Sequence, residues 1–144
     1  MNDDELQKGI ATLELLKVQI ENLQKQIEAL QISIQDNNKA IETIEGYIKM
    51  KEEEILVPVG GGVFLSARIG EKKGLMAIGN DLFVEIPLEK ILENLKERRK
   101  RYEELLSKLT LDIKKLQENY AVLSEKVEKD YRKYLEEMKN VQGP

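Results

Sequence analysis

The chain has 144 residues, 35% of them charged and only 5% aromatic, with a formal net charge of −4. This length favours a single domain spanning residues 1–144, and the interleaved charges disfavour an obligate nucleic-acid binder or a polybasic membrane anchor. The sequence contains no Cys and no His, which excludes disulfides, thiol chemistry and the common zinc sites. No apolar run approaches the roughly 18 residues of a membrane span, and the acidic start does not resemble a signal peptide. We therefore expect a soluble, cytoplasmic protein without membrane contact.

A long helix is predicted over residues 3–53, with Asp3 and Asp4 supplying an N-cap and negative charge in its first turn. One heptad frame fits this segment and places two rows of residues on one face: Leu6, Leu13, Ile20, Ile27, Ile34, Ile41 and Ile48, and Gly9, Leu16, Leu23, Leu30, Asn37 and Ile44. Apolar residues fill the first row and most of the second, which predicts a coiled-coil seam. Asn37 interrupts the apolar stripe, and we interpret it as a register-fixing residue or a water-filled gap.

Between residues 55 and 87 the pattern changes to the period of two that is typical of strands. Short strands are predicted over residues 55–59, 63–69, 75–78 and 82–86, forming two hairpins, with polar turns at residues 70–74 and 79–81. Gly60, Gly61 and Gly62 could suggest a phosphate cradle, but the Lys and Ser/Thr of a phosphate loop do not follow them. A turn or bulge with positive φ is the better interpretation.

These hairpins carry more apolar surface than they can bury alone, since isolated hairpins are marginally stable in water. The apolar residues that need a cover are Val57, Val59, Val63, Leu65, Ile69, Leu75, Ile78, Phe83, Val84 and Ile86. Because the predicted helices point away from the insert, we expect the cover to come largely from other chains. The hairpins are therefore predicted to be an assembly surface, and the protein an oligomer.

A second helix is predicted over residues 88–141. Its seam rows read Leu92, Arg99, Leu106, Ile113, Tyr120, Val127, Tyr134 and Val141, and Leu88, Leu95, Tyr102, Leu109, Leu116, Leu123, Asp130 and Glu137. Helices of similar length joined by a compact connector should pack antiparallel, with facing residue numbers that add up to about 141. Arg99 is then expected to pair with Glu42 or Glu45. The basic run at residues 96–101 is flanked by Glu residues, which favours a solvated helix face over a phosphate-binding surface.

At the far ends of the helices, the seam becomes acidic at Asp130 and Glu137 while apolar residues continue beside it. An apolar patch for adaptable contacts is expected there. Its residues are Leu6, Ile10, Leu13, Leu16, Val127, Tyr131, Tyr134, Leu135, Met138 and Val141. An ordinary coiled-coil core with fraying ends is the alternative.

The insert also carries a sequence motif. Leu56-Val57-Pro58-Val59-Gly60, followed by Gly62, Phe64 and Ala67, resembles the VPVG.G.F..A signature of prefoldin subunits of α type. Ala77-Ile78-Gly79 with Val84-Glu85 is similar to the second hairpin of that family. The resemblance implies an α+β, mostly α fold: a long antiparallel coiled-coil hairpin of two helices with two short β-hairpins inserted between them.

The same resemblance implies function. Hairpins of two α-type and four β-type subunits would join into an intersubunit β-barrel, and the coiled-coil tips would bind unfolded polypeptides and deliver them to a group II chaperonin without ATP. No catalytic residue, cofactor or metal is expected. Some α-like subunits assemble with themselves, even into filaments, so self-association stays open. A structural coiled-coil protein without client handling is the alternative function, and a nucleic-acid binder is a weaker third hypothesis.

Overall fold

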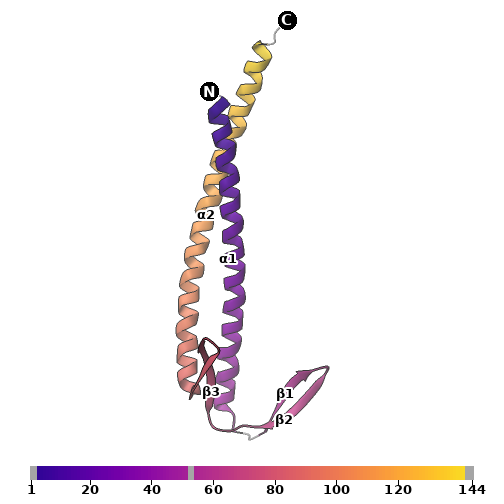
Figure 1. Cartoon of the computed structure of the whole chain (residues 1–144), viewed down its shortest axis with the longest axis vertical. Coiled ribbons are helices and arrows are strands. Elements are labelled where there is room, and N and C mark those ends of the chain that lie inside the picture. The colour runs from indigo at the N-terminus through magenta and orange to yellow at the C-terminus, as the bar shows by residue number, and fades with distance from the viewer. Residues whose placement is uncertain (1–2, 52–53, 142–144) are drawn as a thin grey trace. The chain divides into compact units, whose positions relative to one another are not determined.

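The structure is a computed structural model that describes residues 3–51 and 54–141. Its elements follow in the order α1 (Asp3–Lys49), β1 (Glu54–Gly60), β2 (Val63–Arg68), β3 (Lys73–Gly79), β4 (Leu82–Pro87) and α2 (Leu88–Val141) (Figure 1). Two long helices with two antiparallel β-hairpins between them confirm the predicted fold class. The chain forms two compact units, Met1–Ile32 with Glu104–Pro144, and Ser33–Glu103.

In the unit that contains both ends of the chain, α1 and α2 pack antiparallel along the predicted seam. Leu6, Leu30, Leu109 and Ile113 are buried there, and the other seam residues of this unit are half-buried as far as Tyr134. Beyond Tyr134 the seam rows are exposed. The heptad period therefore predicted which faces of the helices pack together, because the same apolar spacing recurs on both helices.

The core of the other unit lies where α1 ends and α2 begins. Its buried members are Ile41, Leu88, Ile91 and Leu95, packed against partly buried side chains that include Ile44, Tyr47, Ile48, Ile86 and Leu92. Asn37 is also buried, with 4% of its surface exposed. Its Nδ2 donates to the Leu95 carbonyl oxygen at 2.9 Å, while its Oδ1 has no partner among the described residues. This bond ties one position of α1 to one position of α2, as a register-fixing residue must.

The predicted helix register, in which facing residue numbers add up to about 141, is observed at one ion pair. Other contacts between α1 and α2 are shifted from it. Lys96 Nζ lies 3.3 Å from Glu45 Oε1, so the expected pairing of Arg99 with Glu42 or Glu45 is wrong. Lys96 and Glu45 each directly follow a seam residue and reach each other across its edge, whereas Arg99 occupies a seam position itself and is half-buried. The contacts of Asn37 with Leu95, and of Gly9 with Val127, place α1 opposite α2 residues somewhat nearer the hairpins than predicted.

Helix α1 ends at Lys49, earlier than the predicted residue 53. The Met50 N–H donates to the Tyr47 carbonyl at 3.2 Å, which tightens the last turn. The Lys72 ammonium binds the carbonyl groups of Tyr47, Ile48 and Met50. These carbonyl groups are therefore satisfied without another turn of helix. The prediction is therefore wrong for Met50 and Lys51, and residues 52 and 53 lie outside the described part of the chain.

The two hairpins share one turn geometry. Each has a two-residue turn with positive φ at both positions: Gly61 (60°) and Gly62 (74°) in the first, Asn80 (49°) and Asp81 (59°) in the second. Such turns match the right-handed twist of paired strands. A bulge precedes each turn, at Gly60 and Gly79, where φ is 103° and 109°. The interpretation of the glycine run as a turn with positive φ is confirmed.

Strand limits differ slightly from the predictions. Strand β2 ends at Arg68 rather than at residue 69, and β3 begins at Lys73 rather than at residue 75. Lys73 and Gly74 belong to the ladder because they pair with Pro87 and Ile86. The polar turn between the hairpins is therefore shorter than its composition indicated.

Candidate interaction surfaces

The apolar residues predicted at the coiled-coil tip separate into a covered set and an exposed set. The covered residues are buried or half-buried: Leu6, Leu13, Leu16, Val127 and Tyr134. The exposed residues keep between 44% and 86% of their surface accessible: Ile10, Tyr131, Leu135, Met138 and Val141. Figure 1 shows α2 continuing past the start of α1 in this unit. The exposed set, which we call the tip patch, is therefore open to contacts with another polypeptide.

Part of the tip patch lies along one side of the seam. Ile10 directly follows the seam residue Gly9, and Tyr131 directly follows the seam residue Asp130. In an antiparallel coiled coil, residues that follow equivalent seam positions on the two helices line the same side. Met138 lies one heptad beyond Tyr131 and continues this side of α2. The patch thus extends from the paired helices onto the end of α2.

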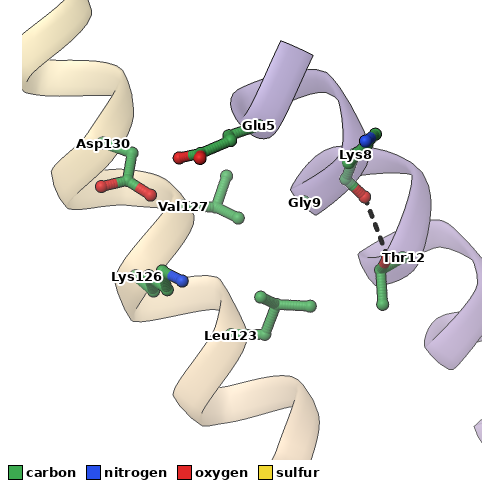
Figure 2. A pocket seen from close by; sticks show the side chains of 8 residues that line it. All are labelled: Glu5, Lys8, Gly9, Thr12, Leu123, Lys126, Val127 and Asp130. Atoms are coloured by element: carbon green, nitrogen blue, oxygen red, sulfur yellow. Dashed lines mark hydrogen bonds between the residues drawn. The ribbon is translucent and has the colours of Figure 1, made fainter. Parts of the chain in front are cut away.

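A groove opens on the other side of the seam, near the start of α1 (Figure 2). Its volume is about 280 Å³, and it is lined by Glu5, Lys8, Gly9, Thr12, Leu123, Lys126, Val127 and Asp130. Gly9 allows the two helices to pack closely, because a Cβ there would lie 2.8 Å from Val127 Cγ2 and something would have to shift. The Thr12 hydroxyl donates to the Lys8 carbonyl at 2.9 Å and is thereby satisfied within α1. The groove combines an apolar lining from α2 with charged groups of both signs.

A second groove of about 390 Å³ adjoins the first. It is lined by Thr12, Leu16, Asn119, Val122, Leu123 and Lys126, some of which line both grooves. Val122 is 71% exposed here. Val122 and the exposed Leu15 were not predicted as surface residues of interest, because both lie off the seam rows. Their apolar side chains at positions where a coiled coil carries polar ones were the available signal.

The first hairpin, β1–β2, exposes apolar side chains on both faces. The register places Val57 opposite Leu65 on one face and Leu56 opposite Ser66 on the other. Phe64, on the face of Leu56, is 60% exposed. The predicted assembly residues of this hairpin are exposed at Val57, Val59, Val63 and Leu65, whereas Ile69, which follows β2, is half-buried. The predicted assembly residues lie on the face of Val57 and Leu65, whereas the exposed Leu56 and Phe64 on the opposite face were not predicted.

The second hairpin, β3–β4, has one face covered by its own chain. Ile86 packs against the core cluster, and Gly74 approaches so closely that a Cβ would lie 2.7 Å from Ile91 Cδ1. The expectation that the cover comes largely from other chains is therefore wrong for this face. The remaining predicted residues of the hairpin, Leu75, Ile78, Phe83 and Val84, are exposed, with Leu75 reaching 71%.

The described surfaces offer apolar contact. Within residues 3–51 and 54–141, no group of three or more His, Cys, Asp or Glu residues could hold a metal ion. None of the helices described is both long and apolar enough to cross a membrane.

Comparison with known proteins defines the class of this chain. The family model described as "Prefoldin subunit" matches residues 16–133. The chain is 35% identical over 131 residues to the prefoldin subunit alpha 1 of Methanocaldococcus jannaschii, covering 81% of this chain and 88% of that protein. It is 34% identical over 111 residues to the prefoldin subunit alpha of Archaeoglobus fulgidus, covering 76% and 81%. The chain belongs to the prefoldin family of chaperone subunits.

The fold of this chain is similar to that of a solved prefoldin structure. The cryo-EM structure of a filamentous prefoldin (PFD) from Methanocaldococcus jannaschii aligns with a TM-score of 0.64, covering 78% of this chain and 95% of that one. The sequence identity of this pair is 21%, so the likeness concerns the fold. The suspected resemblance to α-type prefoldin subunits is confirmed by the archaeal relatives.

Proposed function

We propose that this chain is an α-type subunit of an ATP-independent holding chaperone. Its hairpins join it to other subunits, and its coiled-coil tip binds unfolded polypeptides and passes them to a group II chaperonin in the cytoplasm. The observation that carries the proposal is the distribution of exposed apolar side chains. Most of them lie on the hairpins and at the tip, and fewer lie along the rest of the two helices.

The tip patch has the chemistry that a holding chaperone requires. Tyr131 and Met138 are exposed, and Tyr and Met side chains suit adaptable contacts. Each contact with an unfolded chain would be weak and reversible. Several tips held in one assembly would raise the effective concentration of sites, so a client is retained without any single tight site. Release then needs no nucleotide.

The hairpins supply the means of holding several tips together. The two-stranded sheets expose apolar surface at Val57, Leu65, Leu75 and Phe83, and their outer edges pair with no other strand among the described residues. Pairing with strands of other subunits would cover both the edges and the faces. The archaeal relatives named prefoldin subunit alpha support assembly with other prefoldin subunits. We propose that these partners are β-type subunits, with two α-type and four β-type chains closing a β-barrel.

Removing residues 1–10 and 131–144 tests the tip directly. We expect the shortened chain to assemble like the full chain and to lose its protection of a thermally unfolding client, such as citrate synthase, measured by light scattering. A finer variant carries Tyr131→Ser, Leu135→Ser and Met138→Ser together. We expect it to need at least about tenfold more protein for equal protection, because weak contacts act jointly.

The matched control changes two charged residues of the same helix end, Lys133→Ser and Glu136→Ser. It removes side chains of similar length while leaving the tip patch in place. Equal loss of protection in the control would mean that helix stability, and not the apolar patch, governs client binding. Full protection by the truncated chain would show that the client site lies elsewhere.

Self-association is the second candidate for assembly. It is supported by the likeness in fold to a filamentous prefoldin. In that case the chain alone would form large species without a β-type subunit. A purely structural protein would form them and fail to suppress aggregation of the client. Native mass, measured for the chain alone and after mixing with an archaeal β-type prefoldin subunit, separates these outcomes.

A further inference from the structure

Lys72, in the short connection between the two hairpins, reaches the end of α1. Its ammonium nitrogen donates to the carbonyl oxygen of Tyr47 at 2.7 Å and lies 3.3 Å from that of Met50 and 3.4 Å from that of Ile48. The same nitrogen lies 4.8 Å from the centroid of the Tyr47 ring. One cation therefore contacts several carbonyl groups and one aromatic face at a single helix end.

This arrangement suits the end of a helix. The last carbonyl groups of an α-helix have no helical N–H to bind, and together they carry partial negative charge. An ammonium group has several donors and no acceptor, so it can satisfy more than one carbonyl at once. The Tyr47 ring adds attraction for a cation. An apolar side chain of similar length would provide neither contribution.

The backbone of Lys72 contacts the other helix. Its carbonyl oxygen accepts the N–H of Leu88, the first residue of α2, at 3.0 Å. The first N–H groups of a helix also have no helical partner, so this bond satisfies one of them. Lys72 thus binds the last turn of α1 through its side chain and the first turn of α2 through its backbone.

The residues that follow Lys72 belong to the second hairpin, and they also contact α2. Lys73 is the first residue of β3, and Gly74 packs directly on Leu88 and Ile91. Further along β3, Met76 Sδ lies 3.9 Å from Asn94 Nδ2. The strand that begins at this junction therefore lies against α2 from its first residues.

We propose that Lys72 is a positioning residue: its charge binds the end of α1 while its backbone binds the start of α2, and together these contacts fix the direction in which β3–β4 meets a neighbouring subunit. This attachment, which we call the Lys72 latch, consists of the contacts of the Lys72 ammonium with α1 and of its carbonyl with Leu88. Its effect on assembly rests on the proposed function, in which the hairpins join subunits.

Lys72→Met tests the latch, because methionine keeps much of the length and apolar stem of lysine and removes the charge. We expect faster hydrogen exchange at the Leu88 amide and along β3, and an assembly weakened by about tenfold. Assembly is measured by native mass at decreasing concentration, for the full chain alone and with an archaeal β-type subunit. Lys72→Arg, which keeps the charge, should retain most of the protection. Lys100→Met, an exposed lysine on α2, controls for the change in net charge.

Chemical rescue separates charge from packing. In Lys72→Ala, added n-propylammonium should restore slow exchange at Leu88, whereas n-propanol at the same concentration should not. A side chain that only fills space would respond to neither or to both. Unchanged exchange in Lys72→Met overturns the latch, and faster exchange with unchanged assembly overturns the positioning role. If the unaltered chain does not assemble through its hairpins, the proposed function fails, and the exchange data still decide whether Lys72 holds β3.

Discussion

The two β-hairpins are built alike and placed differently. Both have a glycine bulge followed by a two-residue turn with positive φ. In β3–β4, Gly74 and Ile86 bring one face against the chain's own α2, and the opposite face, with Leu75, is exposed. In β1–β2, by contrast, both faces expose large apolar side chains, including Leu56 and Leu65.

This difference shows that hairpin geometry and hairpin attachment have separate causes. The turn is decided by a few adjacent residues that tolerate positive φ. Attachment depends on a residue with no side chain, Gly74, meeting Leu88 and Ile91 across the junction. The first hairpin lacks such cover from the described residues, so the proposed function requires it to depend more than the second on other subunits.

The largest effect is expected from Leu65→Asp in β2. A carboxylate placed on an apolar face opposite Val57 would have to be buried without a partner when subunits join. We expect the assembly to weaken by at least about a hundredfold, with the helical circular dichroism signal largely kept. Val63→Asp should act in the same way. Native mass by light scattering measures the result.

Ser66→Asp introduces the same charge on the opposite face of β2 and serves as the comparison. Loss of assembly in both variants would indicate that other subunits cover both faces of the hairpin. Loss in Leu65→Asp alone would assign assembly to the face of Val57. An unchanged mass for Leu65→Asp would contradict the role of this hairpin in assembly.

A smaller effect is expected from Gly74→Ala in the second hairpin. The new Cβ would lie 2.7 Å from Ile91 Cδ1 and 3.2 Å from Leu88 Cδ2, so the hairpin must move away from α2 or the core must shift. Overpacking of this kind costs about 1–3 kcal/mol. Thermal unfolding followed by circular dichroism measures the loss.

Gly70→Ala is the matched control for this change. Gly70 precedes β3 by a few residues, and a Cβ there would meet no atom within 4 Å. We expect a neutral or slightly stabilising effect, because alanine restricts the unfolded chain. If both alanine variants unfold at the same temperature, close packing at Gly74 does not hold the hairpin on α2.

Features that repeat along the chain could be predicted from the sequence, whereas contacts that occur at a single place could not. The seam rows are confirmed because the heptad period recurs along both helices and identifies the packed face from many residues together. The Lys72 contacts with the end of α1 occur at one place, and they join residues far apart in the chain. The ion pair of Glu45 with Lys96 rather than Arg99 depends in the same way on a detail that the period does not specify.

The candidate surfaces were predicted in part for the same reason. Strand alternation identified Val57 and Leu65 as one apolar face, but it does not tell which face the chain covers itself. Leu56 and Phe64 were therefore missed, and the cover of Ile86 by α2 was not foreseen. At the tip, the drift of apolar residues off the seam predicted exposed positions such as Tyr131.

The smallest effects are expected in the turns, where the hairpins differ only in residue type. Asp81 has a φ of 59°, which an L side chain adopts at some cost, whereas Gly62 at 74° has no side chain. Gly62→Ala should therefore destabilise the first hairpin by about 1–2 kcal/mol. Asp81→Gly should stabilise the second by about 0.5 kcal/mol or less. The variant relieves the backbone strain at positive φ, but this gain is largely offset because glycine loses more conformational entropy on folding. Hydrogen exchange of the strand amides measures both. A destabilising Asp81→Gly would mean that the aspartate side chain, and not only the backbone, supports the turn of the attached hairpin.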